Sequence, residues 1–164
     1  STAIARLNEM GVPPYLIGSS IVGVMAQRLV RKVCPKCCQT RSIIPEKDKL
    51  AYSYGIQTLK EPTIIDQKSD PYEKGINKNL CNYCNGSGYK GRVGIYEVMR
   101  VNEPIRELIM KESNAEELRE FAFEKQGRSL LVYGMNLVKQ ELTTIEEVER
   151  VCLLSDTNPE DLWN

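Results

Sequence analysis

The sequence contains no histidine among its 164 residues. Histidine is the usual general base near neutral pH and commonly activates serine or cysteine nucleophiles. The sequence also lacks the phosphate-binding pattern G-x-x-x-x-G-K-[ST] and the nucleophile pattern G-x-S-x-G. We therefore do not expect these residues by themselves to form a complete enzyme.

Long apolar runs and a surplus of either charge are also missing. No run of about eighteen apolar residues occurs, so no transmembrane helix is predicted. The chain has 22 basic and 22 acidic residues, whereas nucleic-acid-binding domains usually carry a basic excess. Because 41% of the residues are hydrophobic, the chain can still form a folded core. The composition predicts an ordinary globular chain, and no nucleic-acid partner is expected.

Six cysteines are present, which is too few for a disulfide scaffold in a chain of this length. Four of them form two C-x-x-C pairs, namely Cys34 with Cys37 and Cys81 with Cys84. Four thiolates from two such pairs suit a tetrahedral zinc site, which has no open coordination position and is therefore structural. A redox-active pair or a disulfide is the alternative. Cys38 is expected to be a bystander, and Cys152 a packing residue on the last helix.

Periodicity and turn residues predict most of the local structure. Expected helices cover residues 2–10, 15–20, 45–54 and 130–140, and further helices begin at Asn102, Asn114 and Thr144. Residues 93–101 alternate and predict a strand, while residues 57–79 are polar and predict a loop. Residues 21–33 are ambiguous, because their apolar spacing favours a helix whereas their β-branched content also fits a strand.

Seven basic residues lie near the two cysteine pairs in the sequence, namely Arg28, Arg31, Lys32, Lys36, Arg41, Lys90 and Arg92. A zinc ion with four thiolates keeps a net negative charge, so we interpret these residues as a solvated rim that balances it. A contact to phosphate or another anion is the alternative. Residues 81–88 also match one C-x-x-C-x-G-x-G repeat of DnaJ-type chaperones. A free-standing zinc ribbon that binds nucleic acid or unfolded protein is therefore the alternative function.

Two longer stretches carry a more specific resemblance. Residues 26–37 read AQRLVRKVCPKC, and residues 81–97 read CNYCNGSGYKGRVGIYE. Both closely resemble the C-terminal part of the ATPases of type II secretion and type IV pilus assembly, with the pilus branch the closer. Residues 1–16 and 142–151 resemble the same family.

The resemblance implies a fold and an activity. The whole protein would be a hexameric RecA-like motor whose ATP- and magnesium-binding residues precede Ser1, so this chain would be a non-catalytic C-terminal fragment. The implied fold is an α/β fragment, in which a short antiparallel hairpin carries a zinc-bound, loop-rich insert and is followed by an all-α subdomain. Its expected parts are the end of the core (1–33), the zinc insert (34–84), the return strand (85–101), the helical subdomain (102–153) and the tail (154–164).

The resemblance also bears on local structure, sites and partners. It implies a strand at residues 22–32, against the periodicity, and places Arg92 near the nucleotide base in the whole protein. It implies a homo-hexamer in the bacterial cytoplasm, held at the inner membrane through a platform protein. Removal of the core should leave an exposed apolar face around Ile4, Leu7 and Ile21.

Overall fold

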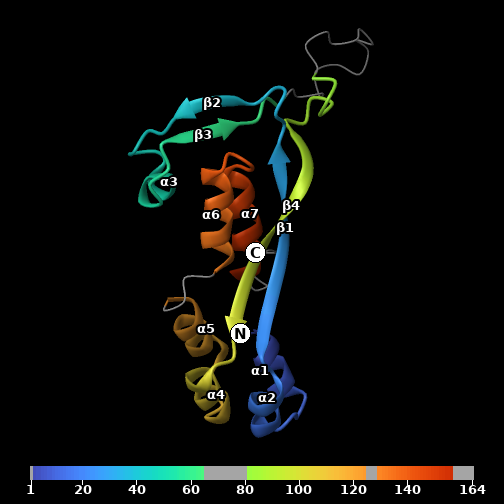
Figure 1. Cartoon of the computed structure of the whole chain (residues 1–164), viewed down its shortest axis with the longest axis vertical. Coiled ribbons are helices and arrows are strands. Elements are labelled where there is room, and N and C mark those ends of the chain that lie inside the picture. Colours follow the sequence, from blue (N-terminus) through green and yellow to red (C-terminus); the bar gives the residue numbers. More distant parts are fainter. Residues whose placement is uncertain (1, 65–80, 125–128, 157–164) are drawn as a thin grey trace, which may run out of the picture. The chain divides into compact units, whose positions relative to one another are not determined.

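The computed structural model describes residues 2–64, 81–124 and 129–156, which form seven helices and four strands. In chain order these are α1 (Thr2–Glu9), α2 (Pro14–Ser20), β1 (Gly23–Val33), β2 (Gln39–Ser42), α3 (Lys49–Ser53), β3 (Thr58–Glu61), β4 (Tyr89–Arg100), α4 (Glu103–Met110), α5 (Ala115–Glu124), α6 (Leu130–Lys139) and α7 (Ile145–Asp156) (Figure 1). The chain divides into two compact units, residues 1–27 with 96–133 and residues 28–95 with 134–164. Residues 157–164 of the expected tail lie outside the described residues.

Strands β1 and β4 pair in a two-stranded sheet, and their arrows run in opposite directions in Figure 1. The N–H of Val101 donates to the carbonyl of Val22 over 3.1 Å, and the N–H of Cys34 donates to the carbonyl of Gly88 over 2.9 Å. The start of β1 therefore lies beside the end of β4, as antiparallel pairing requires. The helix that periodicity favoured for residues 21–33 is wrong, and the strand implied by the resemblance is confirmed.

The burial of β1 explains why its periodicity was misleading. Val30 and Val33 are buried, whereas Met25 and Leu29 are exposed. A strand with one face against a core would alternate apolar and polar residues with a period of two. Burial alternates over Gly23–Gln27, where Val24 packs partly buried against the core of the first unit, but the alternation does not continue to Val33. The helical spacing of the apolar residues of β1 therefore carries no information about the backbone.

The first unit has its own core, formed by α1, α2, α4, α5 and the last residues of β4. Its buried side chains are Ile4, Ile17, Met99, Val101, Ile105, Ile109, Leu118 and Ala122. Ile4 is 1% exposed, and Leu7 and Ile21 pack partly buried against the same cluster. The expected exposed face around these three residues is therefore wrong, because α1 packs against α2 and α5. The exposed apolar side chains of this unit include Met10, Tyr15 and Val22.

Two helices of the first unit begin where the sequence predicted. The Oδ1 atom of Asn102 accepts a hydrogen bond from the N–H of Ile105 over 3.3 Å, and the Oδ1 atom of Asn114 accepts one from Glu117 over 2.8 Å. Each bond satisfies a backbone donor that the first helical turn leaves free. These bonds confirm the predicted starts of α4 and α5.

In the second unit, β2 pairs antiparallel with β3, from Gln39 opposite Glu61 to Ser42 opposite Thr58. The sequence predicted a loop over residues 57–79, so strand β3 was missed, and helix α3 is shorter than the predicted 45–54. Strand β3 is short and polar, and its pairing comes from a partner about twenty residues away. Such a strand has no local signal from which it could be predicted.

Arg41, on β2, forms ion pairs with two acidic residues, one between β2 and α3 and one at the end of β3. Its guanidinium lies 2.6 Å from a carboxylate oxygen of Asp48 and also pairs with Glu61. The Arg41 guanidinium, followed by the N–H of Ile44, lowers the pKa of the Asp48 carboxyl to about 2. Arg41 is therefore a structural residue of the second unit rather than part of a freely solvated rim.

Gly134 permits close packing between α6 and α7. A Cβ at this position would lie 2.5 Å from a methyl carbon of Val148, whose χ1 is restricted in a helix. We expect Gly134→Ala to destabilise the second unit by about 2 kcal/mol, as overpacked cores usually do. Urea unfolding should show this loss and its partial reversal in the double variant Gly134→Ala/Val148→Ala. Equal stability of Gly134→Ala and the unmodified chain would contradict the prediction.

Candidate metal centre

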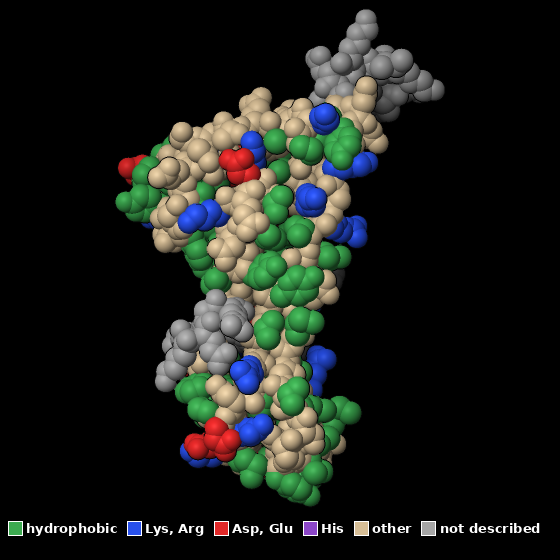
Figure 2. Space-filling model, viewed as in Figure 1, with side chains coloured by type: hydrophobic (Ala, Val, Ile, Leu, Met, Phe, Trp, Pro, Cys, Tyr) green, Lys and Arg blue, Asp and Glu red, His purple; other side chains and the backbone are tan. Residues whose placement is uncertain are grey.

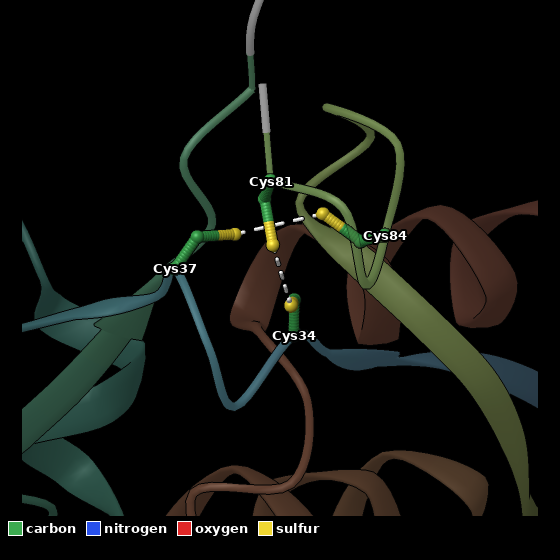
Figure 3. Close-up of side chains that lie close together, drawn as sticks. All are labelled: Cys34, Cys37, Cys81 and Cys84. Atoms are coloured by element: carbon green, nitrogen blue, oxygen red, sulfur yellow. Dashed lines mark hydrogen bonds between the residues drawn. The ribbon is translucent and has the colours of Figure 1, made fainter. Parts of the chain in front are cut away.

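The structure brings together the four cysteines that the sequence predicted as ligands, within the second unit. Cys34 and Cys37 lie on the turn that follows β1, and Cys81 and Cys84 lie on the loop before β4. Their sulfur atoms converge in Figure 3, and all of them lie within 4.8 Å of one another. The Sγ atoms of Cys34 and Cys81 are 3.8 Å apart, and those of Cys37 and Cys84 are 3.6 Å apart.

These distances suit a metal and exclude a disulfide. A disulfide would bring two sulfur atoms to about 2.05 Å, and every described cysteine has a free sulfur. Zinc–sulfur bonds of about 2.3 Å in a tetrahedron place neighbouring sulfurs about 3.8 Å apart. The two closest measured pairs match that edge length. The four sulfur atoms are therefore spaced as the thiolate ligands of one tetrahedral zinc ion would be.

The thiols of the cluster are electrostatically inequivalent. Burial raises the pKa of the Cys37 thiol, and the neighbouring cysteines raise it further. At Cys84 burial also raises the pKa, but the backbone N–H of Gly88 and then the Cys37 thiol oppose it and bring the pKa down to about 6. Four such thiols cannot all ionise side by side without a cation. A divalent metal would supply that charge by displacing the protons.

A glycine loop shapes the second half of the cluster. Gly88 has φ +73°, and a Cβ at this position would lie 2.7 Å from the Cβ of Pro62. Its carbonyl accepts a hydrogen bond from the N–H of Cys34. The C-x-x-C-x-G-x-G pattern of residues 81–88 thus has a local structural explanation. Glycine is needed here both for backbone conformation and for close approach.

A buried carboxylate connects α7 to the end of β1 in the same unit. Glu147 is 2% exposed, and its carboxylate accepts hydrogen bonds from the backbone N–H of Arg31 over 3.1 Å and from the Arg31 guanidinium over 2.5 Å. Arg150 also donates to it, over 3.0 Å. The Thr144 hydroxyl accepts from the N–H of Glu147 over 3.3 Å, so half of the predicted capping box is present. The carboxylate of this T-x-x-E pattern contacts β1 instead of returning to the helix terminus.

Three further contacts lie around this carboxylate. The Arg31 guanidinium lies 4.1 Å from the centre of the Tyr89 ring, and the Tyr89 hydroxyl is 3.3 Å from the Thr144 hydroxyl. The Thr143 hydroxyl donates to the carbonyl of Arg31 over 2.8 Å. Sequence reasoning had found the T-x-x-E pattern but not its partner on β1. We call Arg31, Tyr89, Thr144, Glu147 and Arg150 the α7 network.

The α7 network should make stability sensitive to acid. Burial raises the pKa of the Glu147 carboxyl, but hydrogen bonds from Arg31 and then Arg150 outweigh it and bring the pKa to about 2, below its ordinary 4.5. The ionised carboxylate therefore stabilises the fold above about pH 4.5, and that contribution is lost as pH falls towards 2. We expect up to about 3 kcal/mol of loss over this range.

The acid effect can be isolated with Glu147→Gln, which does not titrate. The difference in unfolding free energy between this variant and the unmodified chain should narrow as pH falls from 4.5 to 2, measured in urea at each pH with both proteins metal-free, because acid protonates the thiols that would hold zinc. A difference that stays constant over that range would contradict the assignment to Glu147.

The other residues that the sequence analysis singled out differ in their exposure and in their contacts. Arg31 and Arg41 make the ion pairs described above, whereas Lys36 and Arg92 are exposed. Cys38 and Cys152 are both partly buried. The Sγ atom of Cys38 is not part of the four-sulfur cluster. The role of Arg92 at a nucleotide base stays a prediction.

The fold and the site together define an α/β chain with a tetracysteine cluster that could hold a metal ion. The family described as "Type II/IV secretion system protein" matches residues 1–150. The chain therefore belongs to the type II/IV secretion system protein family.

Curated relatives come from both branches of this family. The chain is 39% identical over 153 residues to the type II secretion system ATPase E of Vibrio cholerae, covering 91% of this chain and 27% of that protein. It is 38% identical over 148 residues to the type IV pilus assembly ATPase PilB of Thermus thermophilus, covering 89% of this chain and 15% of that protein. It is 34% identical over 155 residues to the type IV pilus assembly ATPase TfpB of Acinetobacter baylyi, covering 94% of this chain and 24% of that protein.

The chain is much shorter than the relatives to which it is similar. It spans between 15% and 27% of the length of these three relatives. Identities to the secretion and pilus proteins are similar, so they do not decide between the branches. No helix in the described part of the chain is both long and apolar enough to span a membrane.

Proposed function

We propose that this chain is the C-terminal region of a hexameric ATPase motor for type IV pilus assembly or type II secretion, and that it carries a structural zinc site. The observation that supports the zinc assignment is the four-sulfur cluster, with its closest sulfurs 3.6 and 3.8 Å apart. The family match over residues 1–150 supports the motor assignment. It favours this function over a free-standing zinc ribbon that binds nucleic acid or unfolded protein.

In this proposal, ATP and magnesium bind residues outside this chain, and the chain itself does not hydrolyse ATP. Zinc stabilises the turn after β1 and the loop before β4, which lie far apart in sequence. Metal-bound thiolates would then replace a larger apolar core at this end of the hairpin. The whole protein would act in the bacterial cytoplasm, at the inner membrane, through the platform protein of its machine. Arg92 would lie near the adenine base.

Metal analysis of the purified chain tests the site directly. We expect one zinc per chain by elemental mass spectrometry and four fewer titratable thiols than in the chelator-treated, denatured chain. We expect no ATP hydrolysis above the level of a buffer control. Absence of zinc from reduced preparations made with zinc in the medium would reject the zinc site but leave the family assignment intact.

The alternative function makes a different prediction. A module that binds nucleic acid through phosphate contacts would bind duplex DNA with an affinity that falls steeply as salt rises. We expect no such binding near physiological ionic strength. Salt-dependent, saturable DNA binding by the chain would favour the free-standing module instead.

A further inference from the structure

A cavity of about 320 Å³ lies in the second unit beside the metal centre. The strands β1, β3 and β4 each contribute a lysine to its lining, Lys32, Lys60 and Lys90 respectively. Tyr83, between the ligands Cys81 and Cys84, also lines it. On the face drawn in Figure 2, Lys and Arg side chains gather over this unit near the end of the β1–β4 pair, with few acidic side chains among them.

The three lysines do not have equivalent partners. Lys60 donates to the Thr40 hydroxyl over 2.7 Å and forms an ion pair over 3.3 Å with Glu141, which also lines the cavity, so these two charges balance each other. The ammonium of Lys90 lies 5.5 Å from the centre of the Tyr83 ring, which holds its chain at the cavity without neutralising it. Within the described residues, Lys32 and Lys90 have no carboxylate partner. The cavity therefore presents two ammonium groups that no carboxylate of the described residues neutralises, although both lie beside the cysteine cluster, whose negative charge with a bound metal they partly offset.

The other residues that line the cavity favour an acidic peptide over a phosphate group. Val33 and Leu142 add apolar surface, and Pro35 lies beside them. The N–H of Val33 donates to the carbonyl of Leu142 over 3.1 Å, so this N–H is not available to a ligand. A phosphate site normally converges several N–H groups or arginines on one group. Separated lysines beside apolar side chains instead suit a chain that alternates carboxylates with aliphatic groups.

We propose that this cavity, defined by Lys32, Lys90, Tyr83, Val33 and Leu142, is a docking site for an acidic peptide segment of a partner protein. Two carboxylates of the segment bind Lys32 and Lys90, and an aliphatic side chain between them packs on Val33 and Leu142. Exposed lysine–carboxylate pairs are individually weak, so the apolar contact is needed for affinity and for selection against simple polyanions. The inference concerns the partner of the metal-binding unit and does not require that the whole protein is an ATPase.

The test uses the zinc-supplemented chain and a fluorescein-labelled peptide of about ten residues in which glutamate and leucine alternate. Binding is followed by fluorescence anisotropy at about 50 mM salt, where surface charge is weakly screened. We expect saturable binding that weakens at least about tenfold in Lys32→Glu/Lys90→Glu. The matched control, Lys49→Glu/Lys111→Glu, changes the net charge equally at two exposed lysines outside the cavity and should stay within about twofold. Lys32→Gln/Lys90→Gln repeats the test with a smaller charge change, and circular dichroism and zinc content show whether each variant is folded.

Several outcomes would overturn the proposal. If Lys49→Glu/Lys111→Glu weakened peptide binding as much as Lys32→Glu/Lys90→Glu, the attraction would be to net charge alone. If a peptide with glutamine in place of glutamate bound equally well, the lysines would not be recognising carboxylates. Binding of inorganic phosphate or duplex DNA that is lost in the Lys32/Lys90 variants, without peptide binding, would assign the cavity to a phosphate ligand instead. No peptide binding by the folded chain would also reject it.

Discussion

Cys84→Ser should abolish stoichiometric zinc binding and cause a larger loss of stability than the other substitutions proposed for this chain. A serine hydroxyl stays protonated near neutral pH and is a poor zinc ligand, so the cluster would lose one of its four thiolates. We expect zinc affinity to fall by about a thousandfold or more, which corresponds to about 4 kcal/mol of lost stabilisation at saturating zinc. Zinc competition with a chromophoric chelator and urea unfolding measure the two effects.

Cys38→Ser is the matched control for this experiment. Cys38 follows directly after the candidate ligand Cys37, but its sulfur is not part of the four-sulfur cluster. Its replacement should leave one zinc per chain and change stability by no more than about 0.5 kcal/mol. Retention of one tightly bound zinc by Cys84→Ser would contradict the four-cysteine site. If the double variant Cys38→Ser/Cys84→Ser then lost the zinc, Cys38 would be identified as a substitute ligand.

Glu147→Gln should cause the second large effect, a loss of about 3 kcal/mol at neutral pH. The amide keeps the volume of the side chain but removes the charge that two arginines contact. It also replaces one acceptor oxygen by a donor group, which would face the N–H of Arg31 or a guanidinium. The loss is smaller than for a fully buried ion pair, because the side chains of Arg31 and Arg150 are about half exposed. Urea unfolding in the presence of zinc measures it.

The neighbouring residue on the same helix provides the control. Glu146 is exposed, and Glu146→Gln removes the same charge from the same turn of α7. We expect its effect to stay within about 0.5 kcal/mol. Similar losses for the two variants would show that the charge of the helix terminus, rather than the contact with β1, is responsible. A change below about 0.5 kcal/mol for Glu147→Gln would reject the stabilising role of the α7 network.

These two predictions concern the same unit but different kinds of constraint. The cysteine cluster joins the turn after β1 to the loop before β4, and the α7 network joins α7 to β1 a few residues earlier. Arg31 lies three residues before Cys34. The end of β1 is therefore held by a candidate metal centre on one side and by a buried ion-pair network on the other. If both predictions hold, loss of either constraint should loosen the other.

The sequence by itself determined the features whose signals are local or chemically specific. Two C-x-x-C pairs predicted the cysteines that converge, because this spacing is typical of the ligands of one zinc site. Asparagine caps predicted where α4 and α5 begin, since each cap bonds only three residues ahead. Residues 26–37 and 81–97 carried the family, which the match over residues 1–150 confirms.

Only the tertiary structure decided the features that depend on partners distant in sequence. The strand β1 has helical periodicity but pairs with β4, and the short polar β3 exists only opposite β2. Ile4 is buried because α1 packs within its own unit, whereas the sequence had predicted exposure. The carboxylate of Glu147 contacts β1 rather than its own helix terminus, and Lys32 and Lys90 line a single cavity although most of the second unit lies between them in sequence. Side-chain type and spacing act over a few residues, whereas these contacts join segments separated by tens of residues, so only the folded backbone could specify them.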